Sequence, residues 1–306
     1  MKLPWKGVDL EGVSTLYSLD DAKDVAEQAC NVKNAVIIGG GSTAMKTIQN
    51  FKKIGLNISI IEKASHLWPI GFDRKVARII EETIKENGIH IYLNEEVVEF
   101  QGDNNKLTFV VLKNGEKIPA DIAIITIGIK PNIDFLVDSG VKIKEGILVD
   151  ENMRTNISSI FAAGDVAQTY DPLYEKPILH PTWGNAKKQG RIAAVNMTGG
   201  NLLYKGVIPI QSIKIFGFTA IAVGITHSKK NFDEISWFSF QEGFCRKFIL
   251  NNNRLVGILM LGKNLNKKEL KPLIKKAVFN MVDVGEYKTE LLNENFDFNQ
   301  ILDDSI

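Results

Sequence analysis

A glycine-rich turn between two apolar runs constrains the fold of this chain more than any other feature. It lies in the stretch from Asn34 to Glu62, where residues 36–38 and 57–61 have the apolar, β-branched composition of buried parallel strands. Between these runs, Gly39 to Ala44 follow the pattern G-x-G-x-x-A, and Ala44, Ile48 and Phe51 then recur at helical spacing. The stretch therefore predicts a strand, a tight turn, a helix and a second strand.

Each part of this unit suits a dinucleotide. Gly39 allows the tight turn, Gly41 lets the backbone approach a pyrophosphate, and the small Ala44 lets helix and strand pack closely. A helix that begins at Ser42 and Thr43 offers unpaired N–H groups and a positive dipole end to the phosphates. An acid about 20 residues further on binds the ribose hydroxyls in such sites, and Glu62 stands at that position. The alternative is a glycine-rich turn with no ligand.

Composition excludes several other classes of protein. The chain has 306 residues, enough for two or three domains, and a net charge of +1 that gives no electrostatic case for binding nucleic acid or a membrane surface. No apolar run reaches the length of a transmembrane helix. The two cysteines, Cys30 and Cys245, lie far apart, and the four histidines lack metal-ligand spacing. We therefore expect a cytoplasmic, reduced protein with no metal site, and both cysteines as buried apolar side chains.

The chain divides into four segments by pattern. Residues 1–32 form a lead-in with one helix, capped by Asp20 and with Cys30 on its apolar face. Residues 33–145 form the nucleotide domain, with a helix from Asp73 to residue 87, a third strand at 89–93, a hairpin at 95–112 and a further buried strand at 122–126. This alternation predicts an open, mostly parallel sheet.

The remaining two segments differ in kind. Residues 146–203 predict strands at 147–150 and 160–163, the second ending at Gly164 and Asp165, and then a helix over about 183–196. Residues 204–306 predict strands at 210–215, 219–224, 236–240, 244–250 and 254–261, a helix at 267–279 and a polar tail that docks or stays mobile. The fold class is therefore α/β with a C-terminal α+β domain.

Four stretches resemble the FAD-dependent pyridine nucleotide–disulfide oxidoreductases, in the branch of NADH oxidase, rubredoxin reductase and NADH-dependent nitrite reductase. They read VIIGGGSTA (36–44), AIITIGIKPN (123–132), TNISSIFAAGDVA (155–167) and WGNAKKQGRIAAVNMTGG (183–200). The resemblance implies an NAD domain inserted into an FAD domain, followed by an interface or dimerisation domain. Residues 1–32 and 146–203 would then be parts of the FAD domain.

The resemblance also implies cofactor contacts. Asp165, after Gly164, would meet the ribitol and pyrophosphate side of the flavin, and the helix start at Gly184, Asn185 and Ala186 would face its pyrimidine ring. Gly128, which lies in the stretch at 123–132, is also an expected cofactor contact. The implied cofactors are NAD(H), preferred over NADP(H) because of Glu62, and FAD. No catalytic side chain is predicted, because the cofactors carry this chemistry.

The sequence departs from the family at three points. The N-terminal half of the FAD domain, which carries the other glycine-rich turn, is absent from these 306 residues. Ser42 replaces a tyrosine that shields the flavin, and Lys46 replaces a glutamate near the nicotinamide ribose. His66 and Lys63 follow Glu62 closely, and either could instead meet a 2′-phosphate.

Two functions remain open. One is a component of an NAD(P)H-dependent FAD oxidoreductase that passes hydride from nicotinamide to flavin and electrons to an unidentified acceptor. The other is a redox-inactive dinucleotide-binding partner or regulatory subunit. Because the predicted strand at 160–163 would have an open, apolar edge, we expect a second copy or a separate chain to cover it. We expect no nucleic acid or membrane partner.

Overall fold

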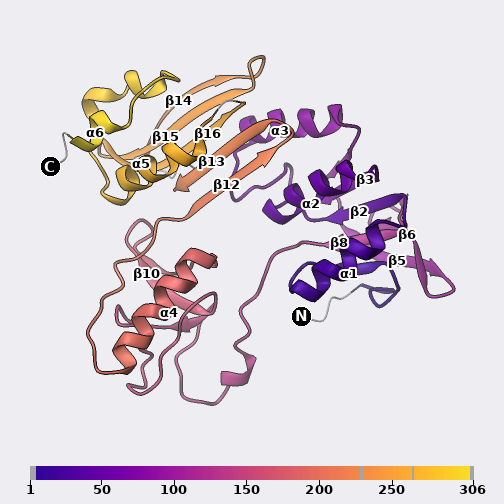
Figure 1. Cartoon of the computed structure of the whole chain (residues 1–306), viewed down its shortest axis with the longest axis horizontal. Helices are drawn as coiled ribbons and strands as arrows, with labels where there is room; N and C mark the ends of the chain where they lie inside the picture. The colour runs from indigo at the N-terminus through magenta and orange to yellow at the C-terminus, as the bar shows by residue number, and fades with distance from the viewer. Residues whose placement is uncertain (1–4, 228–230, 264, 304–306) are drawn as a thin grey trace.

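The computed structural model describes residues 5–227, 231–263 and 265–303, arranged in three regions (Figure 1). The nucleotide domain is drawn in indigo to purple, the C-terminal sheet in orange to yellow, and the flavin half, residues 146–203, in pink to salmon. A long connector after β8 joins the nucleotide domain to the flavin half. The α/β fold class is confirmed.

The nucleotide domain is built on a five-stranded parallel sheet in the order β1-β8-β2-β3-β4. Its central strand, β2, pairs on both sides, so the turn that follows it is supported from two directions. A smaller antiparallel sheet, β5-β6-β7, packs beside it, and Asn104 and Asn105 turn its first hairpin at positive φ. The elements are β1 (Val13–Thr15), α1 (Leu19–Ala29), β2 (Asn34–Ile38), α2 (Ser42–Lys53), β3 (Asn57–Glu62), α3 (Arg74–Glu86), β4 (His90–Leu93), β5 (Val97–Asp103), β6 (Lys106–Leu112), β7 (Lys117–Pro119) and β8 (Ile122–Ile125).

Two predictions about the lead-in are wrong. Ser18, not Asp20, caps α1: its hydroxyl accepts a hydrogen bond from the Asp21 amide at 3.0 Å. Cys30 is exposed rather than buried, because α1 ends at Ala29 and Cys30 occupies the C-cap position beyond the apolar face. The prediction for Cys245 is confirmed: burial encloses this thiol and raises its pKa to about 12.

The flavin half holds a small sheet in the order β11-β10-β9 and one long helix, α4 (Trp183–Met197). The strands are β9 (Ile147–Leu148), β10 (Ala167–Asp171) and β11 (Lys176–Leu179), and a short 3-10 turn, η1 (Asp134–Leu136), lies on the connector. The predicted strand at 160–163 is wrong. Among the residues that the structure describes, Phe161 makes only an isolated bridge to Arg154, and the segment forms no ladder.

The C-terminal domain contains the antiparallel sheet that the sequence predicted, with its strands in the order β12-β13-β16-β15-β14. One of its faces packs on the nucleotide domain and the other on α5 and the tail. The tail docks: Arg246, which is buried, donates to the carbonyls of Leu291 and Glu294. The elements are β12 (Ile210–Ile215), β13 (Phe218–Gly224), β14 (Asp233–Ser239), β15 (Phe244–Asn251), β16 (Arg254–Gly262), α5 (Lys267–Phe279), η2 (Gly285–Tyr287), η3 (Glu290–Leu292) and α6 (Asn299–Asp303).

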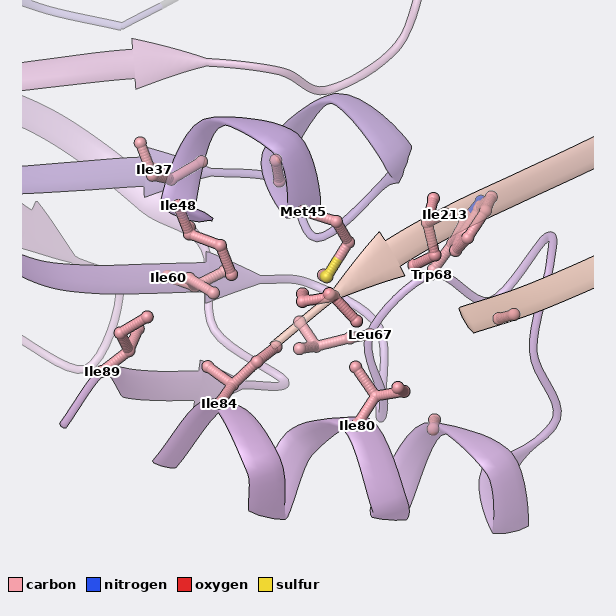
Figure 2. Packing of buried hydrophobic residues seen from close by; sticks show 14 of the residues in the cluster. Ile37, Met45, Ile48, Ile60, Leu67, Trp68, Ile80, Ile84, Ile89 and Ile213 are labelled. Atoms are coloured by element: carbon pink, nitrogen blue, oxygen red, sulfur yellow. The ribbon is translucent and has the colours of Figure 1, made fainter. Parts of the chain in front are cut away.

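One hydrophobic core runs from the nucleotide domain into the C-terminal sheet. It contains Met45 and Ile48 of α2 and Ile80 and Ile84 of α3, and Ile213 of β12 enters it from the other domain (Figure 2). The flavin half has a small cluster around Met153, and a second cluster joins it to the connector around Ile133. The nucleotide domain and the C-terminal sheet are therefore joined by a large shared core, whereas the flavin half contributes only Leu173, with Tyr174 packed beside it, to the core on the other face of that sheet.

Candidate cofactor site

The turn after β2 can accept only glycine at its first position. Gly39 has φ 95°, and a Cβ there would lie 2.7 Å from the carbonyl oxygen of Thr126. Its amide donates to the Ile61 carbonyl at 2.8 Å, and the Thr126 amide donates to Ile38 at 2.7 Å. The turn is thus locked between the carboxyl ends of β3 and β8, the edge at which parallel sheets bind ligands.

The start of α2 faces open space. A Cβ on Gly41 would meet no atom within 4 Å, and Gly41 is the N-cap with no side-chain hydrogen bond. No acidic residue lies in the first turn, where Thr43 is exposed, while Ala44 packs in the core. The first amides of a helix have no intrahelical partner, so this end fits a pyrophosphate.

Glu62 is fixed in place before any ligand arrives. Its Oε2 accepts from the Gly40 amide at 2.6 Å, and its Oε1 accepts from the Ala64 amide at 2.7 Å. The half-buried carboxylate therefore stands directly beside the glycine turn, and each oxygen keeps a lone pair for a ribose hydroxyl.

The two nearby cations are engaged elsewhere. Lys63 pairs with Glu96 at 3.2 Å. The His66 ring contacts the Phe72 carbonyl at 3.2 Å and the Ser65 hydroxyl at 3.3 Å. Lys46 is exposed on α2, one turn after Ser42, which is half-buried. Gly128 has φ 107° on the connector beyond β8, with open space around it.

A second glycine turn and helix start lie in the flavin half. Gly164 has φ 89°, and a Cβ there would meet Ala186 at 3.7 Å, so the loop before Asp165 touches the first turn of α4. Asp165 and Gly184 are exposed. Thr182, the N-cap of α4, makes no side-chain hydrogen bond, and the first turn carries no acid. Asn185, which was predicted as a cofactor contact together with Gly184, has a buried side chain, whereas Gly184 is exposed.

Three segments of this region each expose a large apolar side chain. Ile160, before the turn, is 40% exposed, Phe135 on η1 74% and Trp183 at the start of α4 78%. On the nucleotide side, by contrast, β2 and β3 are paired and buried.

The sequence analysis did not identify three buried polar residues near α4, namely Asp171, His180 and Tyr204. His180 Nε2 lies 2.5 Å from Asp171 Oδ2, and the Tyr204 hydroxyl lies 2.7 Å from Asn185 Oδ1 on α4. The prolines at 172, 177 and 181 hide the signal of the β10–β11 hairpin, which holds Asp171 in its pairing with Lys176. No group of side chains able to hold a metal is found in the part of the chain that the structure describes. Among the same residues, no helix is long and apolar enough to cross a bilayer.

Comparison with known proteins places this geometry in a family. Residues 1–190 match the pyridine nucleotide-disulphide oxidoreductases, and residues 209–278 match the C-terminal domain of rubredoxin NAD+ reductase. The chain is 29% identical over 297 residues to the epsilon subunit of NADH-dependent phenylglyoxylate dehydrogenase from Aromatoleum evansii, which covers 92% of this chain and 70% of that one. It is 25% identical to NADH oxidase from Enterococcus faecalis, over 86% of this chain and 60% of that one.

A solved structure shows the same fold. Water-forming NADH oxidase from Lactobacillus brevis, bound to NADH, superposes with a TM-score of 0.86 at 20% identity, over 100% of this chain and 72% of that one. The chain spans 70% of the length of the first of these relatives and 60% of the second. Because the family match at residues 1–190 covers more than half of the chain, this chain belongs to the pyridine nucleotide-disulphide oxidoreductase family.

Proposed function

We propose that this chain is a component of an FAD-dependent NAD(P)H oxidoreductase, in which hydride passes from nicotinamide to flavin and electrons go on to an acceptor of unidentified kind. One observation carries the proposal. The chain contains two glycine turns that each adjoin the start of a helix with no side-chain cap and no acid in its first turn: Gly39 leads into α2, and Gly164 lies against Ala186 of α4. An acidic residue adjoins each turn, Glu62 and Asp165.

The two helix starts have different tasks in this proposal. The amides at Ser42 and Thr43 bind the pyrophosphate of NAD(H), and Glu62 accepts from the ribose hydroxyls. Asp165 and the start of α4, at Gly184 and Ala186, bind the flavin side of FAD. FAD itself supplies the hydride-accepting ring. The positive end of α4 favours the anionic reduced flavin over the neutral oxidised form.

NAD(H) is the preferred nucleotide in this proposal. Glu62 repels a 2′-phosphate, and the two cations that could attract one are bonded elsewhere, Lys63 to Glu96 and His66 to Phe72. An NADP site needs a cation free to face the ribose. Calorimetric titration with NADH and NADPH tests this, and equal or tighter binding of NADPH would reject it.

The open loop at 160–163 supports a second chain in the working assembly. A separate polypeptide that carries the glycine-rich unit of the FAD domain would add a strand along this loop and hold the ADP end of FAD. A second copy of the chain is the competing arrangement. We further propose a cytoplasmic location. Light scattering of the purified chain with and without FAD tests the assembly, and a monomer with stoichiometric FAD would contradict it.

The alternative function is a redox-inactive dinucleotide-binding partner or regulatory subunit. It is supported by Ser42 and Lys46, which depart from the family pattern beside the expected nicotinamide site. Absorbance separates the two functions. A yellow preparation whose band near the flavin maximum bleaches with NADH supports the oxidoreductase. A preparation that binds NADH but takes up no flavin, alone or with its partner, supports the binding module.

A further inference from the structure

The start of α4 is held from its buried side rather than by a cap. Helices generally begin at a residue whose side chain bonds an amide of the first turn, which contributes about 1 kcal/mol. Thr182 could do so but makes no such bond. The first turn is instead fixed by Asn185, which is 3% exposed. The backbone amides at the start of α4 are thereby left without an acceptor on the side chain of Thr182.

Asn185 ties this turn to two separate segments. Its side-chain amide donates to the His180 carbonyl at 3.1 Å, just beyond the end of β11. Its side-chain oxygen accepts from the Tyr204 hydroxyl at 2.7 Å, on the connector that leads to β12. Both bonds lie in the interior, where a hydrogen bond is not exchanged with solvent and fixes position strongly.

The network continues to a backbone anchor. His180 Nε2 lies 2.5 Å from Asp171 Oδ2, and the other Asp171 oxygen accepts from the amides of Leu173 and Tyr174 at 2.8 and 3.1 Å. One turn along α4, Gln189 accepts from the Gly164 amide at 2.8 Å. The helix start and the Gly164 loop are therefore held by buried side chains of the same helix, one turn apart.

Two further buried atoms lie within this region. Gln189 Nε2 and Thr169 Oγ1 have no hydrogen-bond partner among the described residues. Burial is also the main influence on the Tyr204 hydroxyl, whose pKa it raises. A helix that needed only stability would be served by a hydroxyl cap at Thr182. This arrangement keeps the amide end free and its position fixed.

We propose that Asn185 and Tyr204 are positioning residues that aim the amide end of α4 at the reduced flavin. This rests on the proposed function, since it names residues of the same site. Asn185, expected from the sequence as a cofactor contact, acts through its buried side chain by holding the turn. Its loss would harm the anionic reduced form more than the neutral oxidised form, because a helix end acts on charge.

The test uses Tyr204→Phe, which removes one hydroxyl and keeps the ring. Tyr170→Phe, at a 57% exposed tyrosine on β10, is the matched control. In the full chain without FAD, hydrogen exchange of the amides of residues 186–189, the first that are hydrogen-bonded within α4, should become about tenfold faster in Tyr204→Phe, with the control unchanged. Asn185→Ala should give at least as large an effect.

A second measurement separates positioning from simple stabilisation. With FAD bound, to the chain alone or to its assembly, the ratio of reduced to oxidised flavin affinity should fall three- to tenfold in Tyr204→Phe. A tenfold change lowers the two-electron midpoint potential by about 30 mV. Equal weakening of both redox forms, with an unchanged potential, would overturn the proposal. So would unchanged amide exchange. If the wild-type assembly takes up no FAD, the proposed function fails, and the exchange measurement still decides whether these residues hold the turn.

Discussion

The two glycine turns of this molecule resemble each other in local geometry and differ in what surrounds them. Gly39 follows a strand that is paired on both sides, and its turn is closed by hydrogen bonds to β3 and β8. Gly164 follows residues 160–163, which make one isolated bridge among the described residues, and Ile160 there is 40% exposed. The comparison teaches that the first turn is enclosed by paired strands of its own sheet, whereas the second is held mainly by α4, through Gln189 and Ala186.

The largest expected effect comes from adding a methyl group at each turn. Gly39→Ala places a Cβ 2.7 Å from a backbone oxygen, whereas Gly164→Ala meets Ala186 at an ordinary 3.7 Å. Both variants would hold an alanine at positive φ, which costs about 1–2 kcal/mol. Only Gly39→Ala must also displace the backbone. We expect Gly39→Ala to lower the unfolding free energy by about 3 kcal/mol or more and to abolish NADH binding.

Urea unfolding and NADH titration of both variants check this expectation. Gly164→Ala serves as the control for backbone strain, and its NADH affinity should match the wild type. Equal destabilisation by the two changes would mean that the nucleotide turn is no more tightly enclosed than the flavin turn.

A charge on the open loop should weaken assembly. Ile160→Asp places a carboxylate on the edge where we propose that a strand adds, and charges block edge pairing. We expect at least a tenfold loss of association, about 1.4 kcal/mol, with NADH binding retained. Ile54→Asp, at a 52% exposed isoleucine after α2, is the control. Light scattering of the assembly checks it, and normal association of Ile160→Asp would remove the loop from the interface.

Changes at Glu62 and Glu96 test which nucleotide the first glycine turn prefers. Glu62→Ala removes the expected ribose acceptor and also the bond to the Gly40 amide, so NADH affinity should fall about tenfold, or 1.4 kcal/mol. Glu96→Gln leaves Glu62 intact but frees Lys63, and NADPH affinity should rise a few-fold. Calorimetry with both nucleotides measures each effect. A rise in NADPH affinity that persists in Glu96→Gln/Lys63→Ala would show that Lys63 is not responsible.

The smallest effect concerns the joint between the nucleotide and C-terminal domains. Lys247 is buried between Asp73, at 2.9 Å, and Glu234, at 3.0 Å. Burial raises the pKa of Asp73, but the Val76 amide and Lys247 outweigh it, so the pKa lies below 3.8. A carboxyl with a lowered pKa stabilises the fold above its unfolded pKa, and this contribution is lost as the pH falls below about 4.

Unfolding in urea between pH 3 and pH 7 measures that contribution. In Lys247→Met the curve should be flatter than in the wild type over this range. Lys275→Met, at an exposed lysine of α5, is the control and should keep the wild-type slope. An identical slope in all three proteins would mean that the pair does not link folding to protonation.

The sequence predicted elements whose signal is local. The glycine pattern and the apolar runs gave β2, α2 and β3, and paired asparagines at positive φ turn the hairpins at 104–105 and 252–253. Glu62 lies beside the turn because the carboxyl ends of neighbouring parallel strands meet at one edge.

Features that depend on distant partners were not predictable in this way. Residues 160–163 have strand composition, but among the described residues no strand pairs with them in a ladder. The resemblance implies Asn185 at the cofactor, and nothing local in the sequence shows that Tyr204, 19 residues away, also bonds its side chain in the interior. Cys30 follows the apolar spacing of α1, yet the helix ends one residue before it.

The shared core shown in Figure 2 has a mechanical consequence. Ile213 and Ile215 of β12 are buried in the same cluster as Met45 of α2, so the nucleotide domain and the C-terminal sheet must travel as one rigid arm. The flavin half joins this arm through the chain at 126–146 and 198–209 and through Leu173 and Tyr174, which pack in the core on the far face of the C-terminal sheet. Any movement of the flavin half against the arm must therefore bend both chain crossings and also pull the turn between β10 and β11 out of that core.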